Sequence, residues 1–220
     1  MIGDVRLGEG NTIGPLAVLI GPLVMGDDNW VGVGTVLGAP PEVRDWPHPR
    51  DANELSSGGG IVVGSGNVLR EHVQVHQGWH GVTTIADNAF IMNQTYVAHD
   101  CALEEGVTLA SSVLLAGHVH IGARANIGLG ASVHQKRYVG DGAMVGMASV
   151  VTRDIPPFAK VYGSPARIHG ANSVGMERSG IPQSSIQAVA EAYRDSSDLS
   201  LLAGLDGIEV AFRHWQSFGT

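Results

Sequence analysis

Aliphatic residues recur at every sixth position over most of the chain. The longest run is unbroken from position 85 to position 151, and shorter runs cover positions 7 to 37 and 63 to 75. These positions hold Val, Leu, Ile or Met, and glycine follows directly in ten of the hexads. A helix has a period of 3.6 and a strand a period of 2, so neither alone explains a period of six. The pattern predicts a solenoid of hexapeptide coils, in which each hexad supplies one short strand and one turn.

Three hexads make one triangular coil, so residues 18 positions apart stack on one another. The aliphatic side chains point inward, and glycine permits the tight backbone at the corners. We therefore expect a β-solenoid, a left-handed parallel β-helix of hexapeptide repeats, over residues 1–165. This handedness is an exception to the right-handed rule for parallel crossovers. The composition agrees, because 31 glycines and only 5% aromatic residues suit a narrow interior.

The six-residue register breaks between Leu37 and Val63, which are 26 positions apart. The intervening segment holds four prolines and a glycine run. A solenoid wall cannot absorb such a segment, so we expect a projecting loop at about residues 38–62, and long ordered loops are often functional. A disordered spacer is the alternative. The candidate contacts of the loop are Arg44, Trp46, His48 and Arg50.

A second break lies between Val75 and Ile85, where a short insertion carries His76, Trp79 and His80. The register then continues as far as Val151.

The C-terminal region follows a different pattern. Pro156 and Pro157 predict the end of the strands, because proline cannot serve a central ladder. From about Gln183 the apolar residues follow helical spacing, which predicts a C-terminal α-helical extension over residues 166–220. Its two short amphipathic helices are expected to pack on the solenoid or on a neighbouring subunit. Their apolar faces are formed by Ile186, Val189, Ala190 and Tyr193, and by Ile208, Ala211, Phe212, Trp215 and Phe218.

Composition and charge exclude several classes of protein. The net charge of −8 argues against general nucleic-acid binding. No run of about 18 apolar residues exists and no basic-then-apolar leader is present, so neither a membrane span nor secretion is expected. The single cysteine, Cys101, excludes an intrachain disulfide and indicates a reducing compartment. We expect a cytoplasmic protein.

The charge is unevenly distributed. Residues 121–180 hold seven basic side chains against three acidic ones. This is either chance clustering on a solvated face or a landing surface for an anionic partner. The basic residues are Arg124, Lys136, Arg137, Arg153, Lys160, Arg167 and Arg178.

Three of the ten histidines fall into one geometric relation. Val97, Leu115 and Val133 are 18 residues apart and should stack in three successive coils. His99, His118 and His134 follow them at two, three and one positions, so they are expected near one edge, with neighbouring coils about 4.8 Å apart. His120 lies closer to the next corner, and we interpret it as structural or solvent-exposed.

Such a row of histidines suits two kinds of chemistry. Three histidines are a common catalytic zinc set. Hexapeptide carbonic anhydrases, however, use a histidine pair five residues apart, and this sequence has none, so we expect no metal and no other cofactor. The other chemistry is general-base catalysis, in which His99, with Asp100 beside it, accepts a proton from an attacking hydroxyl or amine. The backbone amide of Gly117 is suited to stabilise the oxyanion of an acyl transfer, since glycine allows close approach.

The motifs HDC (99–101), LAGHV (115–119), SVHQ (132–135) and RDIPP (153–157) together resemble the UDP-N-acetylglucosamine acyltransferase family of lipid A biosynthesis. The similarity runs from about Val63 to Tyr193. It implies a homotrimeric left-handed β-helix with active sites between subunits. It also implies transfer of a hydroxyacyl group from acyl carrier protein to the 3-position of a nucleotide-linked sugar. Acyl carrier proteins are strongly acidic, which would give the basic bias a partner.

The resemblance also assigns roles by motif. His99 resembles the catalytic base, Asp100 its partner and Gly117 the oxyanion donor. The residues that resemble substrate contacts are His118, His134, Gln135, Asn172 and Arg178.

The sequence departs from the family pattern at several positions. Tyr96 stands where the family usually has a second histidine, so we place it among the substrate-binding residues. Val174 replaces an acidic residue, and the coil from Val31 to Leu37 lacks the expected glutamine. Met147 occupies a position that is glycine in members accepting long acyl chains, so it is expected to act as an acyl-chain ruler favouring a shorter chain.

Two alternatives stay open. One is an acetyl-CoA-dependent acetyltransferase acting on another nucleotide sugar, for example at a 3-amino group. The other is a non-catalytic or zinc-binding hexapeptide protein.

Overall fold

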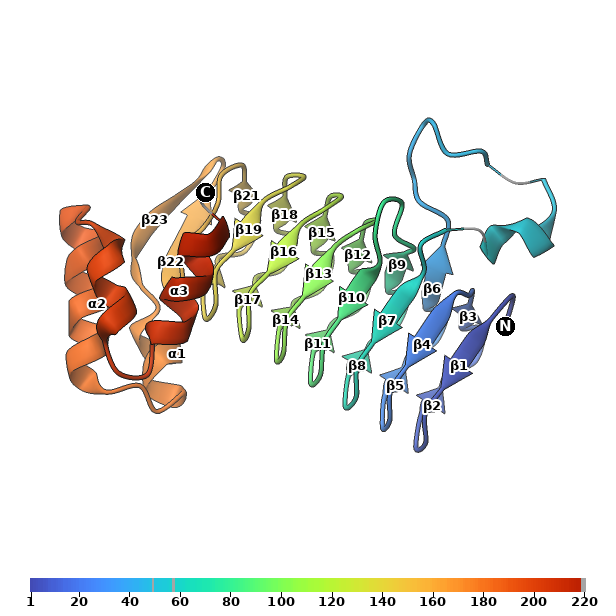
Figure 1. Cartoon of the computed structure of the whole chain (residues 1–220), viewed down its shortest axis with the longest axis horizontal. Helices are drawn as coiled ribbons and strands as arrows, with labels where there is room; N and C mark the ends of the chain where they lie inside the picture. The colour runs from blue at the N-terminus through green and yellow to red at the C-terminus, as the bar shows by residue number, and fades with distance from the viewer. Residues whose placement is uncertain (49, 57, 219–220) are drawn as a thin grey trace.

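The computed structural model describes residues 1–48, 50–56 and 58–218. In this part of the chain, short parallel strands form three sheets that wrap around one axis (Figure 1). From β1 to β21 the chain visits the three sheets in turn, so that strands three places apart in the sequence pair with each other. This is the parallel β-helix that the six-residue period predicts.

The strands of the first sheet, in spatial order, are β1 (Val5–Leu7), β4 (Leu23–Met25), β7 (Ile61–Val63), β10 (Thr83–Ile85), β13 (Ala102–Leu103), β16 (His120–Ile121) and β19 (Tyr138–Val139). Those of the second sheet are β2 (Thr12–Ile13), β5 (Trp30–Val31), β8 (Val68–Leu69), β11 (Phe90–Ile91), β14 (Thr108–Leu109), β17 (Asn126–Ile127), β20 (Met144–Val145), β22 (Ala159–Gly163) and β23 (Ala166–Ala171). Those of the third sheet are β3 (Val18–Leu19), β6 (Val36–Ala39), β9 (Gln74–His76), β12 (Tyr96–Val97), β15 (Leu114–Leu115), β18 (Ser132–Val133) and β21 (Val150–Val151).

The strand register follows the 18-residue coil. Val97 pairs with Leu115, and Leu115 pairs with Val133, as the sequence predicts. From Leu19 to Val151, the aliphatic residue of every hexad is at most 2% exposed. These side chains form one continuous core along the axis, which fixes where each corner residue lies.

The corners use the left-handed backbone region at both glycine and non-glycine residues. Asp100 and His118 have φ values of 58° and 60°. Left-handed backbone costs an ordinary residue energy, so these conformations persist only because the coils above and below hold them.

A loop connects β6 to β7 and projects from the solenoid. It leaves the solenoid after β6, returns at β7 and contains a short 3₁₀ helix, Ala52–Ser56 (Figure 1). Trp46 is buried, whereas Arg44, His48 and Arg50 are exposed. The loop is therefore packed against the chain at least through Trp46.

The strands do not end at Pro156 and Pro157. After these residues β22 adds to β20 in parallel, and β23 returns antiparallel to β22. The prolines lie before β22 and not within it, so no ladder hydrogen bond is lost at either residue.

The C-terminal residues form the helices α1 (Ser173–Arg178), α2 (Gln183–Asp195) and α3 (Glu209–Phe218) and a 3₁₀ helix, Leu199–Gly204. Ile186, Val189 and Phe212 belong to a second hydrophobic cluster, separate from the solenoid core. Helix α3 also lies on the first sheet, where Phe218 stacks on Tyr138 and contacts His120 at ring-centroid distances of 4.2 and 4.7 Å. His120 is thus partly buried and structural. No helix in the described part of the chain is both long and apolar enough to cross a membrane.

Candidate active site

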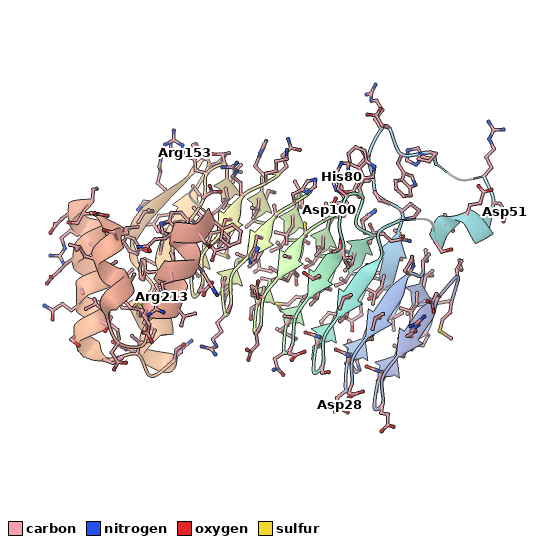
Figure 2. The ribbon with its side chains drawn as sticks, in the orientation of Figure 1. Asp28, Asp51, His80, Asp100, Arg153 and Arg213 are labelled. Atoms are coloured by element: carbon pink, nitrogen blue, oxygen red, sulfur yellow. The ribbon has the colours of Figure 1, made fainter. Side chains whose placement is uncertain are left out.

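The long insertions and the histidine motifs share one corner of the solenoid, where the chain passes from the third sheet to the first. The projecting loop follows β6, and the insertion at 77–82 follows β9. We call this edge the histidine corner; it comprises residues 40–48, 50–56, 58–60, 77–82, 98–101, 116–119, 134–137 and 152–154. In Figure 2 the labelled residues His80, Asp100 and Arg153 lie along this edge, whereas Asp28 lies at another corner.

His99 and Asp100 form a hydrogen-bonded pair. Nδ1 of His99 lies 2.7 Å from Oδ2 of Asp100, and the two side chains are 13% and 6% exposed. The Asp100 backbone N–H donates to Oγ1 of Thr83 at 2.9 Å. A carboxylate on Nδ1 places the proton on that nitrogen, which leaves Nε2 free to accept one.

Backbone amides hold the Asp100 carboxylate from the neighbouring coil. Oδ1 accepts from the N–H groups of Trp79, His80 and Gly81 at 3.1, 3.0 and 2.6 Å. Burial alone would raise the pKa of Asp100, but the hydrogen bonds from His99 and these amides outweigh it and lower the pKa. Asp100 is therefore a fixed anion beside His99.

Gly117 lies directly against the His99 ring. A Cβ added at Gly117 would lie 2.5 Å from Nε2 and 2.6 Å from Cε1 of His99. The Gly117 carbonyl accepts from the Lys136 amide at 3.0 Å, whereas its own N–H has no acceptor among the described residues. Gly117 thus combines a close approach to the His99 ring with an N–H that has no described acceptor, and a preorganised N–H of this kind can stabilise an oxyanion.

His118 completes a cluster of rings around Asp100. Its Nε2 is 3.7 Å from Oδ2 of Asp100, and its ring meets that of His99 edge-on at 5.0 Å. His80 stacks over His118 at 6.2 Å, and Trp79 meets His99 edge-on at 6.1 Å. Burial lowers the pKa of His118 and outweighs the attraction of Asp100, which favours a neutral ring. The insertion residues Trp79 and His80 thus lie beside His99 and His118, a contact that no repeat in the sequence predicts.

A second polar cluster joins the projecting loop to the third sheet. Nδ1 of His76 lies 2.9 Å from Oε2 of Glu42 and 2.7 Å from the Pro40 carbonyl. The Glu42 carboxylate also accepts from the Tyr96 hydroxyl, and the His76 and Tyr96 rings are 5.1 Å apart. Burial and then the Glu42 contact raise the pKa of Tyr96, so its hydroxyl stays protonated. Sequence reasoning missed Glu42, because no periodicity relates a loop residue to the strand that it covers.

His99, Asp100 and His118 also form a possible metal-ligand group, since one ligand atom from each lies within 4.8 Å of the others. The Asp100 oxygens, however, already accept hydrogen bonds from His99 and from three backbone amides. A cation there would have to displace the His99 contact. The donor set fits a positioned base better than a metal centre.

The single cysteine does not contribute a nucleophile. Cys101 is buried beneath the histidine corner, and burial raises the pKa of its thiol to about 12.

The remaining predicted site residues are dispersed. His134 and Gln135 belong to the histidine corner but are exposed, and the hydrogen bond described for the His134 side chain is to the Gln135 carbonyl. Met147 is 72% exposed at the corner between the second and third sheets. Asn172 caps α1 through the Gly175 amide and donates to the Gly142 carbonyl, at the corner between the first and second sheets. Arg178, at the end of α1, is exposed. One chain therefore brings together His99, Asp100, Gly117 and His118. It places Tyr96 in the second polar cluster with Glu42 and His76 and leaves Met147, Asn172 and Arg178 away from both.

The basic residues are also divided among corners. Lys136, Arg137 and Arg153 lie on the histidine corner, where Arg137 pairs with Asp154 at 3.3 Å. Arg124 lies beside Asp141, at the corner between the first and second sheets, in the lining of a cavity of about 400 Å³. The basic side chains on the same corner as His99 are therefore those of Lys136, Arg137 and Arg153.

A triangular solenoid of hexapeptide coils, with a histidine–carboxylate pair held at one corner, defines a hexapeptide-repeat acyltransferase. Comparison with known proteins agrees. Residues 154–211 match the family model described as UDP-N-acetylglucosamine O-acyltransferase, domain 2. The chain is 34% identical over 196 residues to the acyl-[acyl-carrier-protein]–UDP-N-acetylglucosamine O-acyltransferase of Gloeothece citriformis, a match that covers 87% of this chain and 68% of the relative. It is 39% identical over 177 residues to the enzyme of the same name from Halorhodospira halophila, covering 79% and 66%.

The structure is similar to that of the UDP-N-acetylglucosamine acyltransferase from Campylobacter jejuni, with a TM-score of 0.81 and 30% identity over 91% of this chain and 77% of that one. The chain belongs to the UDP-N-acetylglucosamine O-acyltransferase family. Its matched part spans 62 to 68% of the length of the first three curated relatives.

Proposed function

We propose that this protein transfers a hydroxyacyl group from acyl carrier protein to the 3-position of a nucleotide-linked amino sugar such as UDP-N-acetylglucosamine, with His99 as the general base. The observation that carries the proposal is the His99 side chain, with Nδ1 held by Asp100 and Nε2 facing the Gly117 backbone. The names of the relatives supply the substrates.

In this mechanism Nε2 of His99 takes the proton from the 3-hydroxyl as its oxygen attacks the thioester carbon. The carbonyl oxygen becomes an oxyanion, which the Gly117 N–H stabilises. The intermediate then collapses: the carbon–sulfur bond breaks, and the imidazolium returns its proton to the leaving thiolate of the carrier. Asp100 stays ionised throughout and stabilises the imidazolium.

The substrates would be held by Tyr96, His118, His134, Gln135, Asn172 and Arg178. Because Asn172 and Arg178 lie on a different corner from His99, one chain cannot supply all six contacts to one sugar. A homotrimer, in which a corner of one subunit faces another corner of its neighbour, resolves this. The exposed outward side chains of Leu114 and Val150 on the third sheet, 49% and 37% exposed, support such a contact.

Acyl carrier protein would dock along the histidine corner, where Lys136 and Arg153 are exposed. Charge complementarity with an acidic partner raises the rate of encounter and depends on ionic strength. A cytoplasmic location follows from these substrates and from the buried free thiol of Cys101.

The test is a transfer assay on the purified protein with UDP-N-acetylglucosamine and 3-hydroxyacyl carrier protein of several chain lengths, read by mass spectrometry. The same acyl groups on CoA, and acetyl-CoA, run in parallel. We expect acylation from the carrier, and we expect His99→Ala to abolish it while gel filtration still gives a mass of three 23.0 kDa chains. Faster transfer from acetyl-CoA would favour the acetyltransferase alternative, and turnover retained in His99→Ala would remove the base.

A further inference from the structure

The Gln77 side chain is fully buried at the start of the insertion that follows β9. Its Nε2 donates to the carbonyls of Gly38 and Leu55 at 2.6 and 2.9 Å, and its Oε1 accepts from the Gly58 amide at 3.0 Å. Gly38 lies where the projecting loop begins, and Leu55 and Gly58 lie where it returns. One amide side chain therefore ties together both ends of the loop.

The returning arm of the loop then packs backbone against backbone on the insertion. The Gly59 amide donates to the Gly78 carbonyl at 2.8 Å, and the Gly78 amide donates to the Gly60 carbonyl at 3.1 Å. A Cβ at Gly59 or at Gly78 would collide with the Gly81 carbonyl oxygen. This contact fixes the backbone from residue 78 to residue 81.

The same short stretch supplies the amides that hold Asp100. The N–H groups of Trp79, His80 and Gly81 converge on its carboxylate, and the other carboxylate oxygen holds Nδ1 of His99. Successive backbone amides of this kind form a concave anion site whose shape depends on the backbone conformation. An unbroken chain of contacts therefore runs from Gln77 through residues 78–81 and Asp100 to His99.

We propose that Gln77 is a positioning residue for the His99–Asp100 pair: by joining the two ends of the projecting loop, it holds the 79–81 amides in the arrangement that orients Asp100. The inference rests on the proposed role of His99 as the base. It gives the buried Gln77 amide a role in turnover as well as in folding.

Two variants separate the parts of the Gln77 contact. Gln77→Ala removes it. Gln77→Glu keeps an acceptor for the Gly58 amide but replaces the donor to Gly38 and Leu55 with a carboxylate oxygen. Asn67→Ala is the matched control, because Asn67 is also a fully buried amide, bonded to the Asn29 side chain and the Ala89 amide, at a different corner.

The first measurement is kinetic. We expect both Gln77 variants to lower kcat by about 10- to 100-fold, since a displacement of the base of about 1 Å costs up to about 100-fold. KM for the nucleotide sugar and for the acyl carrier should change less than threefold. Asn67→Ala should lower the melting temperature and leave kcat within about twofold of the wild type. A rise in KM with unchanged kcat, or an equal loss of kcat in Asn67→Ala, would overturn the proposal.

The second measurement needs no substrate. The Nδ1 proton shared by His99 and Asp100 should give a downfield proton resonance, identified by its disappearance in His99→Ala. We expect Gln77→Ala to lose or broaden this resonance and Asn67→Ala to keep it. A sharp, unshifted resonance in Gln77→Ala would refute the positioning role. Because this readout is independent of turnover, it also tests Gln77 if the wild-type protein fails to acylate UDP-N-acetylglucosamine.

Discussion

The close approach of Gly117 to His99 predicts that Gly117→Ala destabilises the wild-type protein but does not destabilise a His99→Ala background. In Gly117→Ala the new methyl group would lie 2.5 Å from Nε2 of His99, whereas ordinary contacts begin at 3.4 Å. Gly117 has no positive φ, so its backbone accepts alanine. The ring must therefore move by about 0.9 Å, away from the position set by Asp100.

This displacement of the His99 ring is expected to lower both the stability and the turnover of the protein. Overpacking of this kind costs about 1–3 kcal/mol in stability. A displacement of about 1 Å lowers turnover about 100-fold, equivalent to about 2.7 kcal/mol in the barrier. The backbone N–H of residue 117 remains in the variant, so the loss of turnover would come from the base and not from the oxyanion donor.

In a His99→Ala background the imidazole ring that the new methyl group would meet is absent. The three nearest heavy atoms to the added methyl group all belong to the His99 ring. There, Gly117→Ala should be neutral or should stabilise the protein by about 0.4–1 kcal/mol, because alanine restricts the unfolded chain. The coupling between the two sites should thus exceed about 1 kcal/mol.

The assay is urea unfolding of the wild type, both single variants and the double variant, at one protein concentration because assembly contributes to stability. Equal destabilisation by Gly117→Ala in both backgrounds would refute the contact. Full turnover in Gly117→Ala would refute the requirement for the present ring position.

Three further predictions concern other parts of the molecule. Met147→Gly should lengthen the preferred acyl chain in competition assays with mixed acyl carriers, and an unchanged chain profile would remove Met147 as the ruler. Protection of the projecting loop against limited proteolysis should be greatest between about pH 4.5 and 6.5. Burial opposes charge on both partners, but the contact with His76 lowers the pKa of Glu42, so the stabilisation from the Glu42 carboxylate is lost as the pH falls through the lowered pKa. The same contact raises the pKa of His76, so the stabilisation from the His76 imidazolium is lost as the pH rises through the raised pKa. Glu42→Gln should flatten this profile, and an identical profile in the variant would contradict the link. Phe212→Ala, at a fully buried position of the second cluster, should cost about 3–5 kcal/mol and melt the helices before the strands, as followed by circular dichroism at 222 and 216 nm; a single shared transition would show that the helices and the solenoid unfold together.

The solenoid could be predicted from the sequence because each coil repeats the same local solution. An aliphatic residue every six positions determines which side chains point inward, and the 18-residue stacking of Val97, Leu115 and Val133 follows from counting. The same arithmetic placed His99 and His118 side by side. The fold and the row of histidines that contains the candidate base could therefore be predicted from the six-residue period.

What the sequence could not supply lies between segments that share no period. Glu42 reaches Tyr96 and His76 from a loop, and the 79–81 amides reach Asp100 from an insertion. The N–H groups of Trp79, His80 and Gly81 follow no repeat, so these three partners of the Asp100 carboxylate could not be foreseen. Helix α1 has only six residues, too few to show a helical period, and β22 follows the two prolines because they lie outside its ladder.

The 18-residue coil also places equivalent corner positions at regular intervals along the solenoid axis. Leu129 and Met147 are equivalent positions in successive coils, and both are exposed at the corner between the second and third sheets. If a bulky residue there stops an acyl chain, moving that residue between equivalent positions moves the stop in steps of about 4.8 Å, the spacing between strands. Chain-length preference in such a scaffold would then change in increments of several methylene groups, and finer adjustment would depend on the size of the side chain within one step.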